Sequence, residues 1–132
     1  MERNYDLAGQ IIGLAMKVHR TLGSGFLESV YHKALAIELQ KAGLKVEVEK
    51  PIQVFYEGQV VGDFAADLLV NDEVIVEIKA VQALAPAHEV QTVNYLVATG
   101  KDIGLLINFG ASSLQFKRKF RKAKEEEEFG QD

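Results

Sequence analysis

The sequence predicts an α/β protein of the α+β type, in which helices flank a central mixed β-sheet. Two N-terminal segments carry apolar residues at helical spacing, and three segments of alternating apolar and polar residues, joined by tight turns, follow them. A third helical segment leads into residues 103–109, which are almost all apolar, as in a strand buried on both faces. A strand meander followed by a crossover helix and a buried strand predicts a sheet with both antiparallel and parallel pairs.

The helical segments have recognisable ends. Helices are expected over residues 5–22 and 26–42, where apolar side chains recur every three or four positions, and over residues 86–99. A glycine directly follows each of them, which is common just beyond helix C-termini. Pro86 opens the third helix in the first turn, where proline is tolerated because that amide has no partner within the helix.

The strand segments are separated by short turns. Glu57-Gly58 and Asn71-Asp72 form tight turns between the first three strands. Pro51 interrupts the alternation of the first strand, which then resumes. No internal repeat and no linker long enough to divide the domain is present. The strands are expected over residues 46–56, 59–70, 73–81, 103–109 and 114–119.

Length and composition point to one globular domain. With 132 residues, the chain is expected to fold over residues 1–124 and to end in an acidic, flexible tail over residues 125–132. Its hydrophobic content of 48% and charged content of 26% are ordinary for a globular protein. No apolar stretch approaches the roughly 20 residues that span a bilayer, and the N-terminus does not resemble a signal peptide. A cytoplasmic protein without a membrane partner is therefore expected.

The absence of cysteine limits the metal chemistry. No disulfide and no thiolate ligand is available to this chain. Any bound metal would take oxygen or imidazole ligands, which favours Mg²⁺ or Mn²⁺ over structural zinc.

The charge is unevenly distributed along the chain. The formal net charge is −4, and a basic run over residues 117–124 is followed at once by four glutamates. Without these glutamates and Asp132, five negative charges in all, the count changes from −4 to +1. A charge run is usually a solvated segment. The alternative is an edge that contacts phosphates, with Lys117, Arg118 and Lys119 as candidates.

Acidic residues interrupt two otherwise apolar strands. Asp67 lies near the end of one strand, and Glu77-Ile78-Lys79 lies within the next. Side chains alternate along a strand, so that Glu77 and Lys79 share a face, and a hairpin would bring Asp67 beside Glu77. Charges are costly in such strands unless they bind something. The pattern therefore favours a divalent cation site.

Four motifs in order carry a resemblance to a known family. The segment Gly25-Phe26-Leu27-Glu28-Ser29-Val30-Tyr31 is similar to the signature of the small bacterial and archaeal GxxExxY proteins, which are assigned to the PD-(D/E)XK nuclease superfamily. Asp67 and Glu77-Ile78-Lys79 resemble that superfamily's acidic and Glu-x-Lys positions. Gln91-Thr92-Val93-Asn94-Tyr95 resembles the Gln-x-x-x-Tyr motif of its exonuclease-like branch. The similarity covers nearly the whole folded chain, although Ala66 stands where the name motif has a proline.

The resemblance implies a restriction-endonuclease-like core that hydrolyses phosphodiester bonds of nucleic acid, DNA more than RNA. It implies that Mg²⁺ or Mn²⁺ is held by Asp67, Glu77 and the backbone carbonyl of Ile78. Lys79 would orient the attacking water or stabilise the developing negative charge. The remaining candidates are Glu28, to complete the acidic cluster; Gln91, to orient a water or a phosphate oxygen; and Tyr95, Lys117, Arg118 and Lys119, to contact the substrate.

Alternative interpretations remain for the whole chain and for single residues. A nucleic-acid-binding or protein-interaction module could keep the fold without catalysis, although an unused buried carboxylate pair is destabilising. Tyr31 and Tyr95 fit core aromatic residues at least as well as substrate contacts, and His19 and His32 fit surface positions on helices. The short chain leaves little room for a sequence-reading domain, so a protein partner could supply specificity. The apolar residues of the last two strands permit a homodimer.

Overall fold

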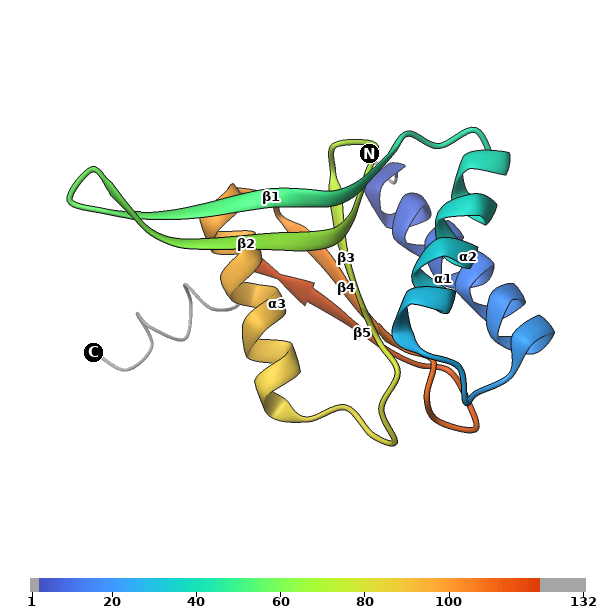
Figure 1. Cartoon of the computed structure of the whole chain (residues 1–132). Helices are drawn as coiled ribbons and strands as arrows, with labels where there is room; N and C mark the ends of the chain where they lie inside the picture. Colours follow the sequence, from blue (N-terminus) through green and yellow to red (C-terminus); the bar gives the residue numbers. More distant parts are fainter. Residues whose placement is uncertain (1–2, 122–132) are drawn as a thin grey trace.

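A computed structural model describes residues 3–121. The predicted acidic tail, residues 125–132, and the end of the basic run lie outside this range. Within residues 3–121, no helix is long and apolar enough to cross a membrane. The elements, shown in Figure 1, are α1 (Arg3–Leu22), α2 (Glu28–Lys41), β1 (Val46–Tyr56), β2 (Gln59–Val70), β3 (Val74–Lys79), α3 (Pro86–Thr99), β4 (Ile103–Asn108) and β5 (Gln115–Phe120).

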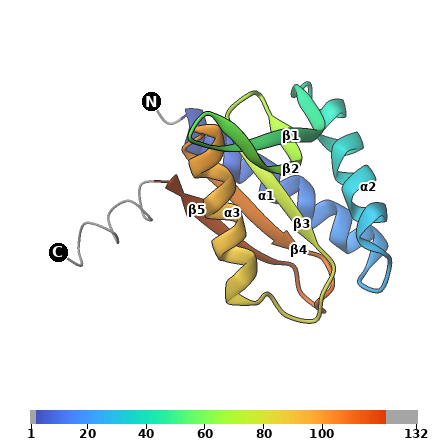
Figure 2. The ribbon, with the colours of Figure 1, turned by 60° about the vertical axis from the view of Figure 1, so that its left-hand side comes forward.

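The five strands form one mixed sheet in the order β1-β2-β3-β4-β5. The β3–β4 pair is parallel and the other three pairs are antiparallel, with α3 as the crossover between the parallel strands. Helices α1 and α2 cover one face of the sheet and α3 covers the other (Figure 2). The predicted fold class is therefore confirmed.

The alternation along β3 decides which side chains enter which layer. Val74, Val76 and Ile78 belong to the large core beneath α1 and α2, whereas Ile75 belongs to the smaller core beneath α3. Glu77 has the same parity as Ile75, so it faces the α3 side of the sheet. An acidic side chain thus enters the α3 layer from the middle of the sheet.

The limits of β1 and β2 are as expected, whereas those of β3, β4 and β5 differ by one or two residues. β1 runs without a break through Pro51, which is tolerated because β1 is an edge strand and a proline there need not donate to a neighbouring strand. β3 ends at Lys79, two residues before its expected end. Beyond it, the Val81 backbone pairs with the Asn108 side chain, whose Oδ1 accepts from Val81 N and whose Nδ2 donates to Val81 O, both at 2.9 Å.

The hairpin of β1 and β2 extends well beyond the part of β2 that pairs with β3. β2 pairs with β3 only over residues 68–70, whereas its pairing with β1 extends to the turn at residues 57–58. The part beyond the sheet, residues 50–66, projects from the molecule (Figure 1) and is called the hairpin arm below. The base of this arm packs on α3, because Ile52 and Ala66 share a core cluster with Leu96.

Candidate active site

Asp67 and Glu77 lie side by side where the ladder between β2 and β3 ends. The last residue pair of that ladder is Leu68–Val76, so that Asp67 and Glu77 follow it on opposite strands. The Asp67 amide donates to Glu77 Oε2 at 3.0 Å, and the Ile78 amide donates to Asp67 Oδ2 at 2.7 Å. Each of these backbone amides therefore donates to a carboxylate oxygen of the opposite strand instead of to a backbone carbonyl. The proximity expected from the hairpin is confirmed.

Burial of the pair strongly favours the neutral form of one carboxyl group. Glu77 is only 4% exposed, and this burial, together with the negative charge of Asp67, raises the pKa of Glu77 to about 8. Burial also raises the pKa of Asp67, although the Ile78 amide and the charges of His32 and Lys79 oppose the effect. Two adjacent carboxyl groups in this environment share a strong preference for a nearby positive charge.

Lys79 provides part of that positive charge. It follows Glu77 by two positions on β3, so both side chains point to the same face of the strand. Its charge lowers the pKa of Asp67 and of Glu77. Burial outweighs this effect at Glu77, so a second cation would stabilise the ionised pair further.

The acidic pair has the donor chemistry that magnesium or manganese requires. Among residues 3–121, no group of three or more His, Cys, Asp or Glu side chains lies close enough together to hold a metal ion. Mg²⁺ is commonly bound by one or two carboxylates and keeps several waters, so a pair of carboxylates is a sufficient protein ligand set. Asp67 and Glu77 therefore fit such a cation, with the Ile78 backbone adjacent to both.

A glycine turn held by a tyrosine brings Glu28 toward this pair. Gly23 and Gly25 adopt positive φ angles of 72° and 115° before α2 begins at Glu28. The buried Tyr31 hydroxyl donates to Gly23 O at 2.6 Å and accepts from Phe26 N at 3.1 Å, while its ring stacks on Phe109. Tyr31 is thus a core residue, and the spacing of glycine, glutamate and tyrosine has a structural explanation.

A small polar pocket connects Glu28 with Asp67. Its volume is about 160 Å³, and Ser29, His32 and Glu49 complete its lining. The negative charge of Glu28 raises the pKa of Glu77, which places Glu28 within electrostatic range of the buried pair. The structure therefore brings Glu28, Asp67, Glu77 and Lys79 into one region.

His32 and Glu49 were not among the predicted site residues. His32 is half-buried, and its Nε2 lies 2.9 Å from the Asp67 carbonyl oxygen. Its position four residues after Glu28 on the same helix face was a usable signal. Glu49 adopts a φ of 53° in an edge strand and raises the pKa of Asp67, but it carried no such signal in the sequence.

Helix α3 supplies the other predicted residues. Tyr95 is 9% exposed and packs beside Phe64 of the hairpin arm, with ring centroids 5.8 Å apart. Burial and the charges of Glu77 and Asp67 raise the pKa of Tyr95, so its hydroxyl lies within electrostatic range of the acidic pair. Gln91, one turn earlier, is half-buried. On the same helix, His88 stabilises the helix start, since its Nδ1 accepts from Ala85 N at 3.0 Å.

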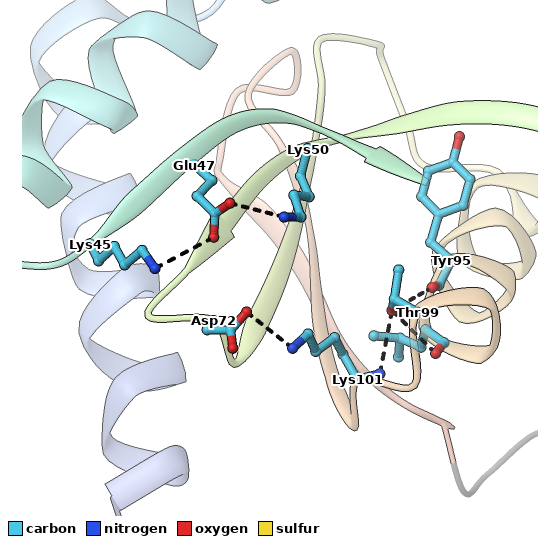
Figure 3. A network of polar contacts seen from close by, with 8 residues as sticks. Lys45, Glu47, Lys50, Asp72, Tyr95, Thr99 and Lys101 are labelled. Carbon is cyan, nitrogen blue, oxygen red and sulfur yellow. Dashed lines mark hydrogen bonds and ion pairs between the residues drawn. The ribbon is translucent and has the colours of Figure 1, made fainter. Parts of the chain in front are cut away.

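The C-terminal end of α3 is tied to the hairpin that carries the acidic pair. Lys101 Nζ lies 3.1 Å from Asp72 Oδ1 in the β2–β3 turn, and Thr99 Oγ1 donates to the Tyr95 carbonyl at 2.8 Å (Figure 3). Nearby on β1, Glu47 pairs with Lys50 (Figure 3). The Lys101–Asp72 pair adds little stability, and it links the segment just after α3 to the β2–β3 turn.

The three basic candidates on β5 do not form one surface. Arg118 lies opposite Leu105, whose side chain enters the core beneath α1 and α2, whereas Lys117 and Lys119 alternate to the α3 face. Lys119 pairs with Glu89 of α3 at 2.9 Å. Lys117, which is exposed, is therefore the best placed of the three to meet a phosphate beyond α3.

Removal of the Tyr31 hydroxyl tests the glycine-turn explanation. Tyr31→Phe removes two part-buried hydrogen bonds, to the Gly23 carbonyl and from the Phe26 amide, so we expect the free energy of unfolding to fall by about 1–3 kcal/mol in urea denaturation. Tyr56→Phe is the matched control, because Tyr56 is 68% exposed, and its stability should not change. Equal stability of wild type and Tyr31→Phe would contradict the structural role of this hydroxyl.

Fold and site together define a protein of the restriction-endonuclease-like class: a mixed sheet covered by helices, with an acidic pair and a lysine where two central strands separate. The chain belongs to the PD-(D/E)XK nuclease superfamily, whose profile matches residues 5–121. No curated protein matches the chain.

Two solved structures share the fold at low sequence identity. The crystal structure of SSO0001 superposes with a TM-score of 0.56 at 19% identity, covering 73% of this chain and 52% of that one. The alkaline exonuclease LHK-Exo from Laribacter hongkongensis superposes with a TM-score of 0.50 at 16% identity, covering 73% of this chain and 57% of that one. The chain thus spans just over half the length of either structure.

Proposed function

We propose that this protein is a metal-dependent nuclease of the GxxExxY branch that hydrolyses phosphodiester bonds, with DNA as the favoured substrate and Mg²⁺ or Mn²⁺ as the cofactor. The observation that carries the proposal is the hydrogen-bonded pair of Asp67 and the buried Glu77, in which the pKa of Glu77 is raised to about 8. A divalent cation would remove this electrostatic cost, and membership of a nuclease superfamily supplies the reaction. The exonuclease activity named for LHK-Exo is consistent with this reaction class.

Each residue of the site has a role that follows from its position. Asp67 and Glu77 would bind the cation through their carboxylates, with the Ile78 carbonyl as a further ligand. When bound, the cation would offset the charge of the scissile phosphate and make a water molecule more acidic. Lys79 would stabilise the negative charge that develops on the phosphate, as a compact cation on the same strand face.

The remaining residues would bind and orient the substrate around this centre. Glu28 would extend the acidic cluster through the small pocket beside Asp67, directly or through a water. His32 would hold the β2 backbone at Asp67 in position. Gln91 would orient a water or a phosphate oxygen from α3, next to Tyr95. Lys117 would contact a phosphate farther along the strand.

The cleavage assay that tests this proposal compares metals and substrates. We expect wild-type protein to cut single- or double-stranded DNA with Mn²⁺ or Mg²⁺, to cut RNA more slowly, and to lose all cleavage in chelator. The same metals should raise the melting temperature, because they bind the folded state only. A protein that neither cleaves any of these substrates nor responds thermally to either metal would favour the alternative, a binding module without catalysis.

A further inference from the structure

An uncharged groove lies between the hairpin arm and α3. Its volume is about 540 Å³, which is within the usual range for sites that bind small molecules. None of its nine lining residues is an Asp, Glu, Lys, Arg or His. Val54 and Phe64 line it from the arm, and Gln91, Asn94 and Val97 are among its residues from α3. The groove is therefore apolar, with two amide side chains at its wall.

Tyr95 links the groove to the candidate active site. Gln91 and Tyr95 line it and are also the two α3 residues predicted to act at the acidic centre. Tyr95 is close enough to Asp67 and Glu77 for both charges to act on its hydroxyl. A substrate strand held at the acidic pair would thus have its neighbouring nucleotide beside this groove.

Charge and shape together select the part of a nucleotide that fits. A phosphate would find no cation in the groove wall and would lie close to the acidic pair, so its burial there is unfavourable. A nucleobase is neutral and flat. Phe64 is 48% exposed and lies against Tyr95 at an interplanar angle of 41°, so an aromatic face is available for stacking.

We propose that this groove binds an unpaired nucleobase of the strand that is cut, with the half-exposed Phe64 as the stacking surface, the buried Tyr95 behind it, and Gln91 at the base edge. This inference rests on the proposed nuclease function. A base within a duplex is stacked and paired, so it reaches such a groove only from a single strand, a frayed end or a flipped position. The site therefore selects single-stranded or end-frayed substrates over intact duplex.

Binding measured without cleavage tests the proposal. Fluorescence anisotropy in chelator compares a labelled single-stranded DNA, the same strand with abasic sites, and the corresponding duplex. Wild-type protein should bind the single strand more tightly than the other two. Phe64→Ala should weaken single-strand binding by about 5- to 150-fold, the loss expected for one base–aromatic stack, and should not change binding of the abasic strand.

Two variants complete the design. Phe55→Ala is the matched control, since Phe55 is a 59% exposed phenylalanine of the same hairpin arm that does not line the groove, and it should bind like wild type. Phe64→Leu keeps apolar bulk but removes the ring, and it should bind nearly as weakly as Phe64→Ala. Both Phe64 variants should keep the wild-type circular dichroism spectrum, because the side chain is half exposed.

Other results overturn the inference. Equal effects of Phe64→Ala and Phe55→Ala, or equal wild-type affinity for single strand and duplex, would exclude base stacking in the groove. A loss of dimers in sedimentation for Phe64→Ala, without an effect on the single strand, would make the groove an interface between copies. If the wild type cleaves DNA but any of these results is found, the proposed nuclease function stands and the base-binding groove is excluded. If Phe64 is needed for single-strand binding but the wild type cleaves nothing, the groove stands and the proposed catalysis is excluded.

Discussion

Asp67→Asn is expected to reduce metal-dependent DNA cleavage by at least about 10³-fold, equivalent to about 4 kcal/mol of transition-state stabilisation. Asparagine keeps an oxygen that can accept from the Ile78 amide, so this hydrogen bond between β2 and β3 should survive. The lost charge, however, removes one of two carboxylate ligands from a site that has no third acid in direct contact among the described residues. Metal-induced thermal stabilisation should fall in parallel.

The matched control for this variant is Asp63→Asn. Asp63 lies on the same strand, four residues earlier, and its exposed carboxylate accepts from Gln53 in the hairpin arm. Cleavage, metal-induced stabilisation and the circular dichroism spectrum should all remain those of the wild type. Retention of cleavage by Asp67→Asn, with the fold intact, would show that the cation is held elsewhere or that cleavage does not depend on it.

Glu77→Gln is expected to stabilise the metal-free protein at pH 8 by several kcal/mol. Folding raises the pKa of Glu77 from 4.5 to about 8, so between these values the folded state binds a proton that the unfolded state has released. The wild-type free energy of unfolding should therefore fall as pH rises from about 5 to about 8, by up to about 1.4 kcal/mol per pH unit. Glutamine stays neutral and lacks this loss, although it should not support cleavage.

Chemical denaturation in chelator at several pH values measures this difference. The two proteins should have similar stability near pH 5 and diverge toward pH 8. Glu89→Gln is the control, because pairing with Lys119 lowers the pKa of Glu89 and its contribution is already complete above its unfolded value. The Glu89→Gln variant should therefore not become more stable relative to the wild type as pH rises from 5 to 8. Equal stability of wild type and Glu77→Gln at pH 8 would show that the buried carboxyl group is compensated in a way that the structure does not explain.

Added metal should reverse the pH trend of the wild type. Because a cation favours the ionised pair, its stabilising effect on the wild type should grow between pH 5 and pH 8 as fewer protons compete with it. The same titration on Glu77→Gln should show little effect of metal at any pH. The carboxylate that weakens the metal-free fold is thus the one expected to bind the cofactor.

The sequence determined the acidic centre because that centre depends on local rules. Alternation along β3 places Glu77 and Lys79 on one face, and the Asn71-Asp72 turn sets a register that brings Asp67 opposite Glu77. The glycines before α2 and the buried Tyr31 likewise explain why Glu28 begins a helix near this pair. Strand period and turn geometry act over a few residues, so the pattern of residue types was sufficient.

Only the tertiary structure decided which distant residues surround this centre. His32 reaches the Asp67 carbonyl because α2 packs on the sheet, and Phe64 meets Tyr95 because the hairpin arm lies over α3. The three basic candidates on β5, by contrast, are divided between its two faces, and Lys119 pairs with Glu89. Such contacts depend on how whole elements pack, which follows from the summed burial of many apolar side chains and has no signature at any single position.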